Sequence, residues 1–203
     1  MQITQFRVGM DNFSYIVQCE RTRKCALIDP GNNASEAMAF IGRENLDIEW
    51  AIATHHHSDH VSEISRVAET YRCGILASAT DASRIEGVTR TVTDGETVML
   101  GSVKLEFIMT PGHTPGSMCI IADGIALFTG DTLFIGDCGR TDLGGGSNSQ
   151  MFDSLQKLKS LPGSIMVYPG HDYGDRAFDT LDNQLRTNKT LVAESLDEFT
   201  RIP

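Results

Sequence analysis

Four of the six histidines of the chain lie within one stretch of six residues, His55-His56-His57-Ser58-Asp59-His60. Imidazole is a common metal ligand and is costly to bury without a partner, so this clustering indicates metal binding. In an extended segment alternate side chains point the same way, which places His55 and His57 together and His56 opposite. We therefore expect His56 not to be a ligand. Asp59 and His60 fall where a helix is predicted to begin, so the turning chain can present a second group of ligands.

Three further polar residues follow predicted strands in matching glycine-containing contexts: His113 in Thr-Pro-Gly-His, Asp131 in Thr-Gly-Asp-Thr and His171 in Tyr-Pro-Gly-His. Glycine beside a ligand permits a tight turn and close backbone approach. Asp131 can bridge two cations because a carboxylate has two oxygens. Taken singly, each is more often a hydrogen-bonded structural residue. Seven N and O donors exceed the four of a closed structural zinc site, which also favours cysteine. Together they predict a metal-dependent active site made of His55, His57, Asp59, His60, His113, Asp131 and His171.

Composition excludes several other classes of protein. The 203 residues are 40% hydrophobic and 22% charged, which is ordinary for a globular domain. The formal net charge of −10 would repel a phosphate backbone, so we expect no nucleic-acid partner. No apolar run approaches the roughly 20 residues of a membrane span, and the N-terminus does not resemble a signal peptide. The five cysteines are dispersed without a CxxC pair, which predicts reduced thiols and a cytoplasmic location.

Short apolar strands alternate with turns and a few helices. Strands are predicted at Phe13–Val17, Cys25–Ile28, Trp50–Thr54, Ile75–Ala77, Met118–Ile121, Ile125–Phe128 and Ile165–Tyr168. Helices are predicted at Ser35–Arg43 with Ser35 as N-cap, at Val61–Tyr71, from a cap at Asn148 or Ser149 to about Leu161, and in a tail from about 176 to 203. Asp123-Gly124 reads as a two-residue hairpin turn. This order predicts two sheets packed together and covered by helices, with the polar motifs gathered on one rim.

The run from His55 to His60 has the HxHxDH form of the metallo-β-lactamase-fold superfamily, and His113, Asp131 and His171 match its remaining ligand motifs in order. The resemblance runs from about residue 10 to about residue 175. It implies an α/β fold, an αββα sandwich of two mixed β-sheets flanked by helices, in a single domain over residues 1–203. It also implies that His55, His57 and His113 hold one ion, that Asp59, His60 and His171 hold another, and that Asp131 bridges them. Asp29 resembles a residue that orients ligands; the alternative is a turn-forming aspartate.

Within the superfamily, the stretches Gly130–Arg140 and Val167–Tyr173 resemble the glyoxalase II group. The β-lactamases proper lack an aspartate at the bridging position, flavodiiron proteins carry glutamate in place of His57, and the nucleases insert a further domain. By this resemblance Tyr173 and Arg140 contact a thiol-bearing substrate, and the alternative for Arg140 is a salt bridge with Asp137 or Asp142. Glyoxalase II enzymes continue into a helical domain that grips glutathione, whereas this sequence ends at Pro203, so glutathione itself is not implied as the carrier.

The resemblance implies a metallohydrolase of the glyoxalase II type that cleaves a thioester or related ester of a small thiol. Two divalent ions, zinc in the first place and iron or manganese otherwise, would lower the pKa of a shared water from about 15.7 to about 7. Asp59 and Asp131 would be catalytic because they orient that water.

Persulfide dioxygenases are the alternative, because they share the fold and a Gly-Arg-Thr-Asp run like that at 139–142. They use one Fe(II), which here would be held by His55, His113 and Asp131. A non-catalytic binding module would have lost a ligand, and the sequence keeps all seven. Association into a homo-oligomer is left open.

Overall fold

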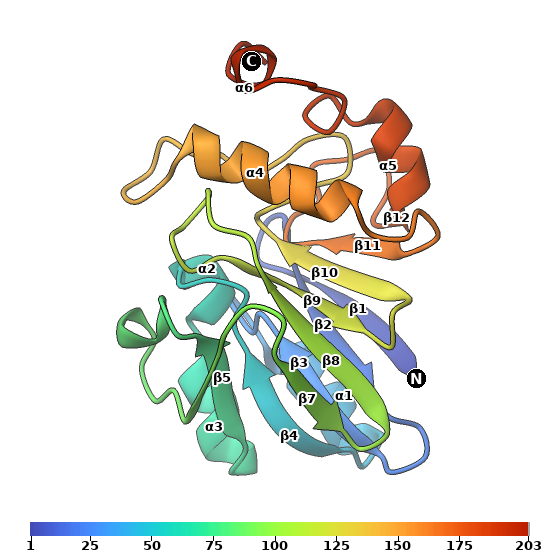
Figure 1. Ribbon diagram of the computed structural model, residues 1–203. Coiled ribbons are helices and arrows are strands. Elements are labelled where there is room, and N and C mark those ends of the chain that lie inside the picture. The colour runs from blue at the N-terminus through green and yellow to red at the C-terminus, as the bar shows by residue number, and fades with distance from the viewer. Residues whose placement is uncertain (203) are drawn as a thin grey trace.

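The computed structural model describes residues 1–202 and contains two six-stranded β-sheets (Figure 1). In the first sheet the strands follow the order β1-β2-β3-β4-β5-β6, and in the second the order is β12-β11-β10-β9-β8-β7. The strands of the first sheet are β1 (Gln2–Val8), β2 (Asn12–Gln18), β3 (Lys24–Ile28), β4 (Asp47–Ile52), β5 (Gly74–Ser78) and β6 (Arg90–Val92). Those of the second are β7 (Thr97–Leu100), β8 (Val103–Met109), β9 (Met118–Ala122), β10 (Ala126–Gly130), β11 (Met166–Pro169) and β12 (Asp179–Thr180). Both sheets mix parallel and antiparallel pairs.

Helices cover the two outer faces, which confirms the αββα sandwich. They are α1 (Ser35–Arg43), α2 (Ser58–Val61), α3 (Ile64–Tyr71), α4 (Asn148–Lys159), α5 (Leu181–Thr187) and α6 (Leu196–Phe199), with a short 3₁₀ turn η1 (Ala82–Arg84). In Figure 1, α4 lies across the top of the view with α5 and α6, while α1 and α3 lie at the bottom. No helix within residues 1–202 is long and apolar enough to cross a membrane.

Three apolar clusters fill the spaces between these layers, as the alternation of side chains along each strand requires. In β3, Ala26 and Ile28 face the second sheet, whereas Cys25 and Leu27 pack against α1 and α3. The central cluster also holds Tyr15, Phe107 and Phe128. The third cluster joins the second sheet to α4, α5 and α6 through residues that include Leu127, Leu155, Leu181 and Phe199. The third cluster also holds Leu133 and Ile135, so the core reaches the loop that follows Asp131.

Strand register brings those loops to one edge. Ile28 pairs with Ile52 in the parallel strands β3 and β4, so Asp29 and His55 follow at the same end of the sheet. In the second sheet Gly130 pairs with Pro169 in parallel strands β10 and β11, so Asp131 and His171 also follow at one end of their sheet. Met118 donates its N–H to the carbonyl of Thr54, at 2.9 Å, and so joins the edges of the two sheets there.

The structure corrects several predicted boundaries. The predicted helix Val61–Tyr71 is divided into α2 and α3, because Glu63 donates its backbone N–H to Pro30 O (3.0 Å) and Ser62 Oγ accepts from Asn32 N (2.9 Å). Ala34, not Ser35, precedes the first turn of α1, and Ser147 caps α4 by accepting from Gln150 N. The tail from about 176 begins with strand β12, which pairs with β11, before α5 and α6. A hairpin turn is present at Asp123-Gly124, with both residues at positive φ, but its loop has three residues rather than two because Ala122 pairs with Ala126.

Candidate metal centre

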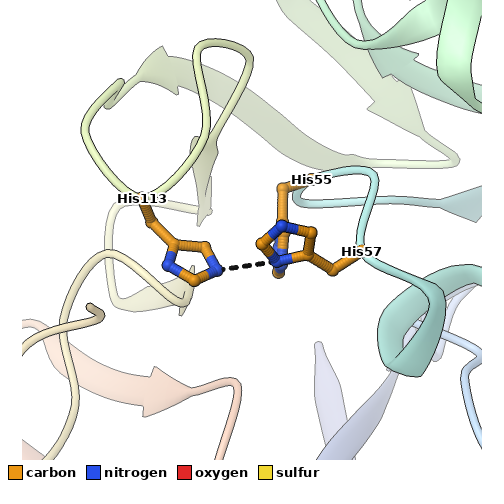
Figure 2. A group of neighbouring side chains, drawn as sticks. All are labelled: His55, His57 and His113. Atoms are coloured by element: carbon orange, nitrogen blue, oxygen red, sulfur yellow. Dashed lines mark hydrogen bonds between the residues drawn. The ribbon is translucent and has the colours of Figure 1, made fainter. Parts of the chain in front are cut away.

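The first group of donor atoms is formed by His55, His57 and His113, which face one another from two different loops (Figure 2). His55 Nε2 lies 3.2 Å from His57 Nδ1, and His57 Nδ1 lies 2.9 Å from His113 Nε2. A tetrahedral zinc ion with Zn–N bonds of about 2.0–2.1 Å has ligand nitrogens about 3.3 Å apart. The spacing of these rings is therefore close to that of ligands sharing one ion.

The second group is formed by Asp59, His60 and His171. His60 Nε2 and His171 Nε2 are 3.2 Å apart, and Asp59 Oδ2 lies 3.4 Å from His171 Nε2 and 3.5 Å from His60 Nε2. Asp59 and His60 belong to α2, which begins immediately after His57. The turn of the chain at this helix start directs consecutive side chains toward two different groups, as predicted from the spacing.

Asp131 lies between the two groups. Its Oδ2 is 3.4 Å from His113 Nε2 and 3.3 Å from His171 Nε2, and its Oδ1 is 3.2 Å from His60 Nε2. Oδ1 is buried and accepts no well-directed hydrogen bond from the described residues. A buried carboxylate oxygen left without a hydrogen bond is costly unless a cation satisfies it. The donor set, all imidazole and carboxylate, fits divalent ions such as zinc or iron.

In the rings of His60 and His113, the nitrogen that faces away from the donor groups is held by a partner outside them. His60 Nδ1 lies 2.9 Å from Asp29 Oδ2, and His113 Nδ1 donates to the carbonyl oxygen of Arg140 at 2.7 Å. Such contacts fix the tautomer so that the lone pair of Nε2 points toward the ion. Asp29 also accepts hydrogen bonds from Thr54 N and Thr54 Oγ1, both at 2.7 Å. The carboxylate of Asp29 is thus placed to orient His60 rather than only to form a turn.

The crowding of these groups shifts their pKa values in opposite directions. Burial lowers the pKa of His55 well below its usual value, and nearby His60 lowers it further. Burial also disfavours charge on His171, but hydrogen bonds to Asp131 and Asp59 raise its pKa to about 9. The pKa of Asp131 is well below its usual range because the neighbouring histidines outweigh the effect of burial. An ion bound here would take the place of the proton that His171 otherwise holds, since a ligand imidazole must be neutral.

Sequence reasoning missed several residues near this centre, among them Asn12 and Asp81. Asn12, at the start of β2, donates Nδ2 to Asp59 Oδ2 at 2.8 Å, and its Oδ1 accepts from Asn32 Nδ2 at 2.7 Å. The β1–β2 turn reaches the second donor group because Asn12 also forms a β-bridge with His171. Asp81 is fully buried and contacts His56, which points away from the ligands as expected. Neither residue belongs to a repeated or metal-binding motif, so no signal in the chain marked them.

A cavity of about 200 Å³ adjoins the centre and is lined by His113, Asp131, Phe134, Asp137, Cys138, Arg140 and Tyr173. Tyr173 stacks on His171 with ring centroids 4.8 Å apart, and 57% of its surface is exposed. The guanidinium of Arg140 forms a two-pronged salt bridge with Asp142, at 2.6 and 2.7 Å. Arg140 therefore lines the cavity and also forms the salt bridge with Asp142 that was the predicted alternative to substrate contact. A second cavity of about 460 Å³, beside α5, shares Tyr173 and Asp137 with the first.

Comparisons with known proteins agree with this geometry. A family model described as the Metallo-beta-lactamase superfamily matches residues 8–171. The hydroxyacylglutathione hydrolase of Rhodospirillum rubrum is 41% identical over 174 residues, which are 85% of this chain and 67% of that protein. The crystal structure of ETHE1 from Myxococcus xanthus superposes with a TM-score of 0.90 at 30% identity and covers 100% of this chain and 92% of its own. TTHA1623, solved in a di-iron-bound form, gives a TM-score of 0.79 at 27% identity over 91% of this chain and 98% of its own. The chain thus spans about two thirds of the length of the curated hydrolase.

Proposed function

This chain belongs to the metallo-beta-lactamase superfamily, and on that basis we propose that it is a metal-dependent hydrolase that cleaves the thioester of a small thiol carrier at a two-ion centre. The observation that carries the proposal is the position of Asp131, whose two oxygens face donor groups on both sides. In this proposal His55, His57 and His113 hold the first ion, and Asp59, His60 and His171 hold the second. Asp131 bridges them, and zinc is the proposed metal, with iron or manganese as the alternatives.

When bound, the two ions supply a water of lowered pKa and a Lewis acid for the substrate carbonyl. The side chains of the protein then have to position the substrate and orient the attacking water. Asp59 is proposed to orient the attacking water through its carboxylate, whose Oδ2 accepts a hydrogen bond from Asn12 Nδ2 at 2.8 Å. A departing thiolate, with a reference pKa of about 8.5, needs no strong general acid, so Asp59 and Asp131 suffice as the catalytic carboxylates.

The substrate class is inferred from the cavity and from the relatives. The cavity beside His113 and Asp131 ends at the exposed Tyr173, whose ring offers an apolar face to a thiol carrier. Arg140 lies at the same rim. Its guanidinium could bind an anionic carrier if the carrier replaced Asp142 as its salt-bridge partner. The name of the Rhodospirillum rubrum relative specifies an acylated glutathione, and we propose thioesters of this kind as the first substrates to test.

The test combines metal analysis with thiol release. Protein purified without added metal should contain close to two metal ions per chain and should release thiol from a hydroxyacylglutathione. Asp59→Asn should lower turnover by at least about 100-fold, since groups that act on the attacking water contribute about 10²–10⁴-fold. Asp153→Asn, a change of the same kind on the exposed face of α4, should leave turnover unchanged. Equal rates in Asp59→Asn and the native chain would exclude the assigned role.

A persulfide dioxygenase with one Fe(II) is the second candidate. His55, His60 and Asp131 form a two-histidine, one-carboxylate group with donor atoms within 4.8 Å of one another, a pattern typical of non-haem iron. The resemblance had implied His113 in place of His60, and His113 Nε2 lies 3.4 Å from Asp131. One iron per chain with oxygen uptake on a glutathione persulfide, and no thioester cleavage, would favour this candidate over hydrolysis.

A further inference from the structure

The buried carboxylate of Asp81 connects two loops that carry metal-site residues. Asp81 precedes η1, in a segment that contributes no residue to either donor group. Its Oδ2 accepts three hydrogen bonds: from His56 N at 3.1 Å, from His56 Nδ1 at 2.8 Å and from Thr114 Oγ1 at 3.1 Å. His56 lies between His55 and His57 in the chain, and Thr114 follows His113. One oxygen atom therefore joins the two loops that supply the whole first donor group.

Asp81 is itself held in one position. Its backbone N–H donates to Ser78 Oγ at the end of β5, at 3.2 Å. Gly116 packs directly against the carboxylate, because a Cβ there would lie 2.2 Å from Oδ1. The side chain is 1% exposed, so water does not compete for these hydrogen bonds. A carboxylate fixed in this way can determine how far apart the two loops lie.

The second donor group does not depend on Asp81. Asp59 and His60 are held by Asn12 and Asp29, and the backbone next to His171 is joined to the β1–β2 turn by the hydrogen bond from Asp172 N to Asp11 O, at 2.7 Å. None of these contacts involves Asp81. A change at Asp81 should displace the rings of the first group and leave those of the second in place.

We propose that Asp81 is a positioning residue for the first ion. Asp81 acts through its hydrogen bonds to His56, the non-ligand residue of the HxHxDH motif. These bonds hold the neighbouring His55 and His57 at the correct distance from His113. The inference rests on the proposed two-ion centre. His57 is only partly buried and sits on a loop, so without this support its ring must be ordered at the moment of binding. Loss of residues that orient ligands typically weakens metal binding about 10- to 100-fold.

The experiment measures zinc affinity at each position separately. Metal-free protein is titrated with zinc against a chelating indicator in two backgrounds, His171→Ala, which impairs the second group, and His57→Ala, which impairs the first. In the His171→Ala background, Asp81→Ala should weaken zinc binding about 10- to 100-fold and Thr114→Val, which removes one of three hydrogen bonds, about tenfold. In the His57→Ala background, Thr114→Val should leave the affinity for zinc unchanged.

Arg84→Ala is the matched control, because it removes a contact to Asp81 that touches neither loop. It should leave both affinities unchanged. If Asp81→Ala does not fold, as judged by circular dichroism of the metal-free protein, Thr114→Val decides the question. Equal weakening of both positions by Thr114→Val, or no weakening of the first, would overturn the inference while leaving the proposed hydrolase intact. A native chain that binds none of zinc, iron and manganese would overturn both.

Discussion

Replacement of Asp29 by asparagine should weaken binding of the second ion by changing which nitrogen of His60 carries the proton. In the native chain Asp29 Oδ1 accepts from Thr54 N, and Oδ2 accepts from both Thr54 Oγ1 and His60 Nδ1. An asparagine retains one oxygen, which must face the backbone N–H of Thr54 because that donor cannot change. Its amide nitrogen then faces Thr54 Oγ1, which can accept, and His60 Nδ1, which cannot remain a donor.

His60 has two responses, and both cost free energy. It can keep its proton on Nδ1 and leave a buried donor without an acceptor, which costs about 1–3 kcal/mol. It can instead move the proton to Nε2, the atom that faces Asp59 and His171, and then it cannot bind metal through that atom. At about 1.4 kcal/mol per tenfold change, 1–3 kcal/mol corresponds to about 5- to 150-fold weaker binding.

The assay is competition titration of metal-free Asp29→Asn with zinc, in the His57→Ala background so that the second group is measured alone. Asp153→Asn, on the exposed face of α4, serves as control. Urea unfolding of the same proteins without metal would separate loss of fold from loss of binding. If Asp29→Asn binds zinc as tightly as the control, the tautomer of His60 is not set by Asp29 and the reasoning is wrong.

Three further outcomes follow from contacts described above. Asn12→Ala removes a hydrogen bond to the Asp59 carboxylate worth about 1.5–3 kcal/mol, so kcat should fall at least about tenfold while metal content stays the same; an unchanged kcat would contradict the role given to Asn12. Gly31→Ala should lower the melting temperature and loosen zinc, because the new Cβ would lie 1.7 Å from the backbone oxygen of Asp59; a native melting curve would refute this. Burial raises the pKa of Cys138 to about 12, so this thiol stays protonated at pH 8. Iodoacetamide should therefore label it far more slowly than a free cysteine of pKa about 8.5, with a labelling rate that rises up to about pH 12. Rapid labelling at pH 8, located by peptide mapping, would show that the thiol is more accessible than the structure indicates.

Much of the centre could be predicted because ligand-type residues stand immediately after strands. Parallel strands end at the same edge, so His55 after β4 and His171 after β11 had to lie at rims that the sandwich brings together. Glycines such as Gly112, at φ +145°, marked the tight turns beside ligands. In β8, Val103, Leu105 and Phe107 alternate with Lys104 and Glu106, and the three apolar side chains form its buried face.

The residues that escaped prediction act through contacts between segments far apart in the chain. Asn12 meets Asp59 across 47 positions, and Asp81 meets Thr114 across 33. A single asparagine or aspartate near a turn is common and carries no spacing signal, so only the packed structure reveals its partner. The break between α2 and α3 was missed for the same reason, since it arises from a hydrogen bond between Glu63 and Pro30.

The donor atoms come from loops of both sheets: His55, His57, Asp59 and His60 follow β4 of the first, whereas His113, Asp131 and His171 follow β8, β10 and β11 of the second. Ions bound between them would cross-link the two halves of the molecule at the end where these loops meet. Pulling the sheets apart would then require the ligands to be released first, so the barrier to unfolding, and with it the lifetime of the folded chain, would be governed by metal dissociation. The same atoms that serve chemistry would in that case also protect the enzyme from proteolysis.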